Sequence, residues 1–207
     1  MDFITVLPED IEKKSFEIIT EELGDTALTS GAEDVIKRVI HATADFDYVK
    51  NLCFSDNAVR IARDAIRNGA SIVTDTMMAR AGINERALSA FGGSVYCFMS
   101  DADVAAKAKD LGATRAAASM EKAAGIGIPL IFVIGNAPTA LIALDRLVRQ
   151  GKVTPKLIIG TPVGFVNVVQ AKELIMESGI PYIVARGRKG GSNVAAAICN
   201  AILYGIK

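Results

Sequence analysis

Short apolar runs alternate with amphipathic stretches over the last two thirds of the chain. The runs are bounded by glycine, proline or polar residues, which is typical of buried strands. We predict strands at residues 71–74, 94–98, 130–134, 156–159 and 182–185. Helices are predicted around residues 85–90, 104–111, 115–124, 140–150, 166–178 and 192–204. This alternation indicates right-handed crossovers and a mostly parallel sheet with helices on both faces.

The first third of the chain has helical periodicity instead. Pro8 suits the first turn of a helix, and Gly24 suits its end. A second helix is predicted to begin with the acidic residues 33–34, and a third to be capped by residues 55–56. Because no linker, repeat or low-complexity stretch divides the sequence, we predict a single α/β domain over residues 1–207, with a helical N-terminal third.

Composition narrows the class of protein. Lys+Arg and Asp+Glu number 23 each, which argues against a basic surface that binds nucleic acid. The three cysteines lack CxxC spacing and the N-terminus lacks a signal-peptide layout, so we expect reduced thiols and a cytoplasmic protein. Residues 123–144 carry no charge, but glycine and proline interrupt them, and we expect no membrane span.

The chain has one histidine, His41. Histidine is the side chain that gains or loses a proton most easily near neutral pH. Helical spacing places Asp34, Arg38, His41 and Asp45 on one polar face, with His41 near the C-terminal end of its helix and beside Asp45. Two interpretations stay open on spacing alone: a proton-transferring group, or a surface histidine within a solvated row of charges.

Four segments that follow predicted strands are rich in small and hydrogen-bonding residues. They are residues 74–78, 135–139, 160–165 and 185–192. Ligands of open parallel sheets bind beyond the carboxyl ends of the strands, where glycines allow close approach and helix N-termini favour anions. Any one loop alone could be a tight strand-to-helix turn. Four on one edge indicate a broad site for a ligand with several carboxylates or phosphates.

Several common chemistries lack their motifs. The Gly125-Ile126-Gly127 segment has no third glycine at dinucleotide-binding spacing, and residues 187–192 lack the lysine and hydroxyl ending of a P-loop. A single histidine cannot form an HExxH or multi-histidine metal site, and no GxSxG segment is present. A nucleotide-dependent enzyme is therefore a weaker alternative, and no protein-bound metal is expected.

Seven segments, in order along the chain, match one known family. They are residues 11–16, 38–45, 72–78, 114–117, 135–141, 162–167 and 186–192. At these residues the sequence resembles the precorrin-8X methylmutases, the methyl-shifting isomerases of cobalamin biosynthesis. The resemblance covers nearly the whole chain.

The resemblance implies a dimeric α/β isomerase that moves a methyl group from C-11 to C-12 of a corrin ring. The product would be hydrogenobyrinate, or cobyrinate if cobalt is already present, and the sequence leaves that choice open. No organic cofactor is implied, because the methyl group moves within one molecule, and any cobalt would be carried by the substrate. The family's catalytic histidine falls on His41, as proton donor and acceptor. A tetrapyrrole carrier that binds the same ligand without converting it is the alternative.

The substrate expected from the resemblance is a large, mostly apolar ring edged with carboxylate arms. The cations expected to bind those arms are Arg115, Arg186, Arg188 and Lys189. Arg38 is also expected in the site, because it shares the polar face of His41. The residues expected to offer neutral hydrogen bonds are Ser15, Thr74, Asn136 and Thr161. Asp75 could be structural or could face a ring nitrogen.

Overall fold

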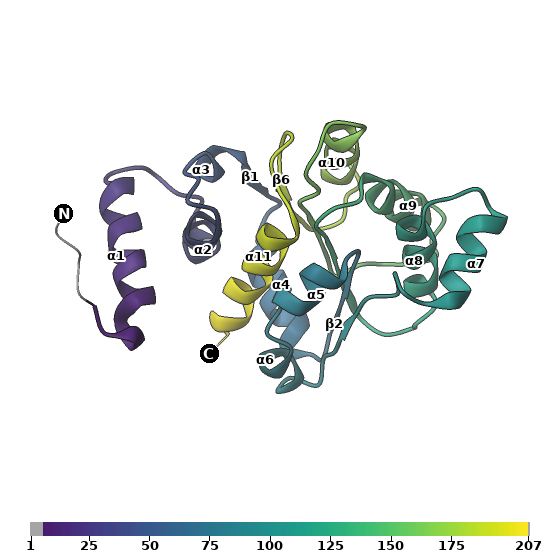
Figure 1. Ribbon diagram of the computed structural model, residues 1–207, viewed down its shortest axis with the longest axis horizontal. Helices are drawn as coiled ribbons and strands as arrows, with labels where there is room; N and C mark the ends of the chain where they lie inside the picture. Colours follow the sequence, from purple (N-terminus) through teal and green to yellow (C-terminus); the bar gives the residue numbers. More distant parts are fainter. Residues whose placement is uncertain (1–5, 207) are drawn as a thin grey trace.

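A six-stranded sheet forms the centre of the computed structural model, which describes residues 6–206 (Figure 1). The strands are β1 (Leu52–Phe54), β2 (Ser71–Thr74), β3 (Val95–Tyr96), β4 (Leu130–Ile134), β5 (Leu157–Gly160) and β6 (Tyr182–Ala185). Their order across the sheet is β1-β6-β5-β4-β2-β3. All neighbours are parallel except β1 and β6, so the predicted mostly parallel sheet is confirmed.

Helices fill the segments between the strands and the first part of the chain. They are η1 (Pro8–Asp10), α1 (Ile11–Leu23), α2 (Glu33–Thr43), α3 (Tyr48–Asn51), α4 (Ala58–Arg67), α5 (Met77–Gly82), α6 (Glu85–Ser89), α7 (Ala102–Asp110), α8 (Arg115–Ala124), α9 (Pro138–Arg149), α10 (Val168–Met176) and α11 (Ser192–Tyr204). No helix within residues 6–206 is long and apolar enough to cross a membrane.

Alternate side chains of each central strand pack into two separate cores. Along β4, Ile131 and Val133 join the core shared with α2, α4, α5 and α11. Phe132 and Ile134 join the opposite core, with α8, α9 and α10. All residues of β4 are buried, as expected of a parallel strand covered on both faces. The helices therefore cover both faces, as predicted (Figure 1).

Two local expectations were wrong. The sequence pattern missed β1, a three-residue edge strand that pairs antiparallel with β6. Residues 55–56 do not cap α4; the helix follows Asn57, whose φ of 57° is left-handed. The Ser55 hydroxyl instead accepts a hydrogen bond from the Tyr182 N–H at 2.9 Å. Ser55 therefore joins β6 to the chain that leaves β1.

Candidate active site

Asp75 directly follows β2 and binds the loop that follows β4. The strand order reverses between these two neighbouring strands. The chain leaves β2 toward α5 on one face and leaves β4 toward α9 on the other. The Asp75 carboxylate accepts hydrogen bonds from the N–H groups of Gly135, Asn136 and Ala137, at 2.8, 2.9 and 2.6 Å. Its burial raises its pKa, and the three N–H donors oppose that rise.

The position held by Asp75 is the one where an open α/β sheet commonly binds the anionic group of a ligand. Here the protein's own carboxylate occupies it, and Asp75 is only 1% exposed. Of the two roles left open for Asp75, the structure supports the structural one. A nucleotide phosphate would have to displace this carboxylate.

Thr74 and Thr161 also lie beneath the surface, where both are 0% exposed. The Thr74 hydroxyl is 3.1 Å from the carbonyl oxygen of Thr76, and the Thr161 hydroxyl is 3.3 Å from that of Ile134. Their side chains therefore hold loops in place, and the expectation that they offer hydrogen bonds to a ligand needs correcting. The polar residue type was compatible with a ligand contact, but burial removes the surface that such a contact requires.

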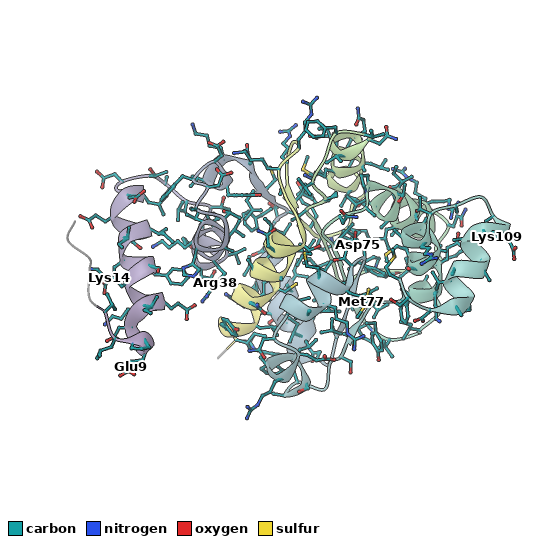
Figure 2. All side chains as sticks on the ribbon, in the orientation of Figure 1. Glu9, Lys14, Arg38, Asp75, Met77 and Lys109 are labelled. Atoms are coloured by element: carbon teal, nitrogen blue, oxygen red, sulfur yellow. The ribbon has the colours of Figure 1, made fainter. Side chains whose placement is uncertain are left out.

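Arg115, Asn136 and Arg188 are exposed at the carboxyl edge of the sheet. Arg115 begins α8 next to the start of α9, because the Thr114 and Thr139 hydroxyl oxygens lie 2.8 Å apart. Large exposed apolar side chains follow β2 and β5 at the same edge. They are Met77, Met78, Val163, Phe165 and Val166. Figure 2 labels Met77 and Asp75 in this central region. An apolar surface with arginines beside it suits a broad ring with carboxylate arms.

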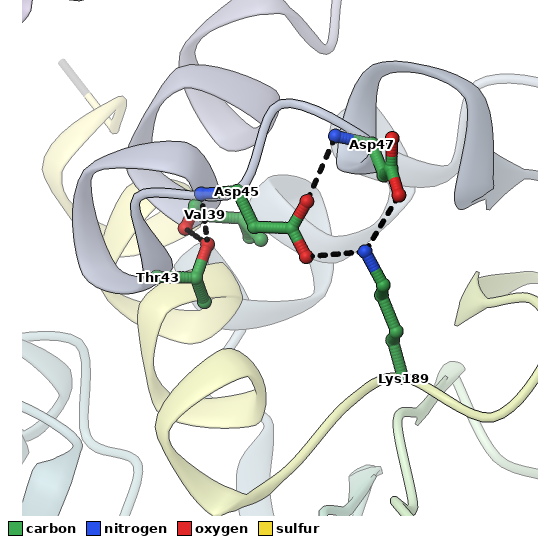
Figure 3. Close-up of polar contacts among 5 residues, drawn as sticks. All are labelled: Val39, Thr43, Asp45, Asp47 and Lys189. Atoms are coloured by element: carbon green, nitrogen blue, oxygen red, sulfur yellow. Dashed lines mark hydrogen bonds and ion pairs between the residues drawn. The ribbon is translucent and has the colours of Figure 1, made fainter.

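The three cations of the last loop have different surroundings. Arg186 donates to Glu173 at 2.8 and 3.3 Å. Lys189 donates to Asp45 and Asp47 at 2.7 and 2.6 Å (Figure 3), and these hydrogen bonds raise the pKa of Lys189. Arg188 is exposed, and its guanidinium carbon lies 5.4 Å from the centroid of an exposed phenylalanine ring, that of Phe165.

These contacts change the expected roles of the three cations. Carboxylates of the protein already bind Arg186 and Lys189. Within residues 6–206, no carboxylate forms an ion pair with Arg188. Of the three, Arg188 is the best placed to meet a carboxylate from outside.

His41 lies near the end of α2, whose Val35, Ile36, Val39 and Ile40 are buried. The His41 ring is exposed and stacks on Phe16 of α1, with centroids 5.2 Å apart and ring planes 9° from parallel. A cavity of about 260 Å³ lies between α1 and α2. It is lined by Ser15, Ile18, Ile19, Glu22, Ile40, His41, Ala44 and Phe46. The structure thus brings Ser15 and His41 together.

The predicted row of charges beside His41 does not form. Asp34 pairs with Arg63, and Arg38 pairs with Glu12 of α1. Helix α2 ends at Thr43, and the next residue, Ala44, has a left-handed φ of 52°. Asp45 therefore lies beyond the helix, where it pairs with Lys189. The expectation that Asp45 lies beside His41 was therefore wrong.

Arg38 lies between α1 and the end of α11 (Figure 2). Its guanidinium carbon is 4.7 Å from the ring centroid of Phe16 and 5.4 Å from that of Tyr204. Phe16 therefore contacts both Arg38 and His41. Sequence reasoning missed Phe16, although an aromatic residue next to Ser15 was a usable signal.

The candidate residues form two groups within one chain. Ser15, Arg38 and His41 lie at α1 and α2, and the exposed edge residues lie on loops of the sheet. Lys189 connects the groups, because it reaches from the last loop to the turn that follows α2 (Figure 3). Within residues 6–206, no cluster of three His, Cys, Asp or Glu residues is placed to hold a metal ion.

A lysine that sequence reasoning missed supports the last loop from inside. Lys172 of α10 is buried and donates to the carbonyl oxygens of Gly187 and Lys189, both at 2.8 Å. It lies in the buried stripe of α10 with Val168, Ala171 and Ile175. A lysine at helical spacing among apolar residues was the signal that could have identified it.

Known proteins resemble this chain over nearly its whole length. The family model for precorrin-8X methylmutase matches residues 10–205. A cobalt-precorrin-8 methylmutase of Priestia megaterium is 44% identical, over 96% of this chain and 88% of that protein. A precorrin-8X methylmutase of Pseudomonas aeruginosa is 39% identical, over 93% of each. A crystal structure of a Thermus thermophilus precorrin-8x methyl mutase has a TM-score of 0.86 and 40% identity, covering 94% of this chain and 96% of that one.

The fold, the loops at its carboxyl edge and these relatives define an isomerase of corrin biosynthesis. The chain belongs to the precorrin-8X methylmutase family. Enzymes of this kind transfer a methyl group within one molecule.

Proposed function

We propose that the protein moves a methyl group from C-11 to C-12 of precorrin-8 or cobalt-precorrin-8, giving hydrogenobyrinate or cobyrinate. The observation that carries this proposal is the family match over residues 10–205, which includes the single histidine. No organic cofactor is proposed, because the migrating methyl group needs no external donor. Cobalt, where present, belongs to the substrate.

His41 is proposed to be the proton donor and acceptor. Phe16 stacks on the face of the His41 imidazole. The two nitrogens at the edge of the imidazole therefore remain available to a substrate. Its place in a cavity together with Ser15 supports this role. Protonation of the macrocycle would favour the tautomer from which the methyl group migrates. Positioned general acid–base catalysis supplies roughly 10²–10⁴-fold in rate, and selection of a strained ring conformer would supply the remainder.

The carboxylate arms are proposed to bind Arg115 and Arg188 at the carboxyl edge, with Asn136 as a neutral partner. The exposed apolar side chains after β2 and β5 would cover the face of the ring. Ser15 and Arg38 would complete the site around His41. Arg186 and Lys189, which are bound by Glu173, Asp45 and Asp47, would shape the loop.

A homodimer is proposed as the working form, in the cytoplasm. Helix α1 stands at one end of the molecule beside α2 (Figure 1) and buries only Ile19 and Leu23. Leu7, Ile11 and Ile18 are 62%, 55% and 37% exposed around it. A second subunit that covers this apolar surface could bring its edge loops to His41, so that each site has residues from both chains.

Conversion of substrate separates this function from that of a carrier. Purified protein would be incubated separately with metal-free precorrin-8 and with cobalt-precorrin-8. The product would be identified by its absorption spectrum and by a changed chromatographic retention time at unchanged mass. We expect the methyl-shifted product from at least one of the two substrates. The substrate that reacts faster shows whether the enzyme prefers the metal-free or the cobalt-loaded ring. Binding of both substrates without conversion would support the carrier instead.

A further inference from the structure

Lys172 is a buried lysine whose ammonium group is bound by two carbonyl groups. Its side chain is 0% exposed, and its ammonium donates to the carbonyl oxygens of Gly187 and Lys189. Within the described part of the chain, Lys172 forms no ion pair. Buried charges are usually paired with opposite charges, and an apolar residue would fit this stripe of α10 at lower cost. The position of Lys172 therefore requires an explanation beyond packing.

The segment that Lys172 contacts is fixed through its backbone. Arg188 lies between Gly187 and Lys189, and its carbonyl oxygen accepts a hydrogen bond from the Gly164 N–H at 3.2 Å. The Gly191 N–H donates to the carbonyl oxygen of Thr161 at 2.7 Å. At Gly190 a Cβ would clash with that same oxygen, so only glycine fits. The loop thus rests on the chain after β5 and on α10.

Two lysines hold this loop from opposite sides. Lys172 binds its carbonyls from the interior, and the Lys189 side chain binds Asp45 and Asp47 outside (Figure 3). Arg188 lies between the two carbonyls that Lys172 binds, and its guanidinium is exposed over Phe165. The Lys172 ammonium therefore binds the backbone on both sides of Arg188.

We propose that Lys172 is a positioning residue for corrinoid binding, which fixes the Gly187 and Lys189 carbonyls so that Arg188 meets a carboxylate arm of the substrate. This inference rests on the proposed function. Lys172 acts only through the loop and touches no substrate atom. Replacing it would therefore weaken binding through Arg188, with a smaller effect on the rate of the bound reaction.

The charges around Lys172 are already engaged elsewhere. Glu173, the next residue on α10, binds Arg186, and Lys189 binds Asp45 and Asp47. Burial lowers the pKa of Lys172 to about 8. The neutral amine keeps two N–H donors for the two carbonyls, so the positioning contacts persist when the proton is lost.

A double-mutant cycle between Lys172→Met and Arg188→Ala tests the proposal. Corrinoid affinity would be measured by absorbance titration with hydrogenobyrinate, alongside KM and kcat. We expect Lys172→Met to weaken affinity about tenfold in the wild-type background and less than about twofold in the Arg188→Ala background. Lys156→Met is the matched control, because Lys156 is exposed just before β5, at the opposite edge of the sheet. It should leave affinity unchanged.

Equal weakening in both backgrounds would overturn the proposal, as would unchanged affinity in folded Lys172→Met. If Lys172→Met does not fold, Lys172→Gln replaces it in the cycle, because glutamine keeps a polar group at this buried position on a side chain too short to hold both carbonyls as lysine does. The same dependence on Arg188 is expected of it, and its absence would overturn the proposal. Failure of both variants to fold would make Lys172 a folding residue and overturn its positioning role. Titration with product needs no turnover, so this result is independent of whether the wild-type protein converts precorrin-8.

Discussion

Arg186, Arg188 and Lys189 lie within one short loop, yet their neighbours assign them different roles. Glu173 binds Arg186, and two aspartates bind Lys189. Arg188 instead lies over an aromatic ring at the surface. An exposed ion pair within a protein contributes little stability, but it does reduce the charge that a ligand meets. From residue type alone, all three cations would be expected to bind substrate carboxylates equally well.

Arg188→Ala should therefore weaken substrate binding more than Arg186→Ala. We expect KM to rise about tenfold for Arg188→Ala and less than about threefold for Arg186→Ala, with kcat near the wild-type value in both. Steady-state kinetics at low salt would measure this. Equal effects of the two substitutions would contradict the distinction drawn from their ion pairs.

The lowered pKa of Lys172 has a consequence for stability. Folding lowers this pKa from 10.5 to about 8. Between these values the unfolded chain binds more protons, so the contribution of Lys172 to the free energy of unfolding rises as pH rises through this window. Denaturant unfolding of wild type and Lys172→Met at about pH 7 and about pH 9.5 would show it. The stability difference, wild type minus variant, should be larger at the higher pH, and a constant difference would refute the assignment.

At the scale of elements, the two loops around Asp75 act as one unit. Three N–H groups before α9 depend on one carboxylate that follows β2. An amide at this position has a single acceptor oxygen and directs its own N–H₂ group toward a donor. The conformations of both loops therefore depend on the ionised side chain.

Asp75→Asn should destabilise the protein by about 2 to 4 kcal/mol, because buried N–H donors lose their acceptor. The folded variant should retain turnover within about threefold of wild type, since Asp75 is too deeply buried to contact the ring. Thermal unfolding and single-turnover kinetics measure the two effects. A large loss of turnover with unchanged stability would indicate that Asp75 faces a ring nitrogen after all.

Elements in the core were predictable because burial imposes a pattern on the sequence. Strands β4 and β5 are covered on both faces, so they appear as continuous apolar runs. Strand β1 has three residues directly after α3, too few to show a period. The candidate site was less predictable. Thr74 ends β2 and Asn136 follows β4, so their positions in the sequence look alike. Thr74 is buried by contacts with distant segments, such as its hydrogen bond to the Tyr96 carbonyl, whereas Asn136 is exposed, and the sequence does not show these contacts.

For the whole molecule, the arrangement of α1 bears most on function. This helix carries Ser15 and Phe16, packs on α2 and leaves apolar side chains exposed. His41 and the edge loops thus form separate groups in one chain, which a second subunit could combine.

Mixed dimers test whether each site is shared. One chain would carry His41→Ala, and the other would carry alanine at Arg186, Arg188 and Lys189. The assay would use a substrate concentration far below the raised KM of the loop variant, at which neither parent dimer shows measurable turnover. If His41 and the loop of the neighbouring chain serve one site, each mixed dimer has one intact site and activity returns. Subunit exchange would be verified with differently tagged chains. Exchange without recovered activity would rule out the shared site, and a monomer at working concentration would rule out the dimer.

The central claim is that the methyl shift proceeds through proton transfer at His41. Single-turnover conversion of precorrin-8 by His41→Ala, with corrinoid affinity and thermal unfolding measured on the same preparation, tests it most directly. We expect the rate to fall by about 10²-fold or more, while affinity and stability stay close to wild type. A folded His41→Ala enzyme that converts its substrate within about threefold of the wild-type rate would contradict the claim.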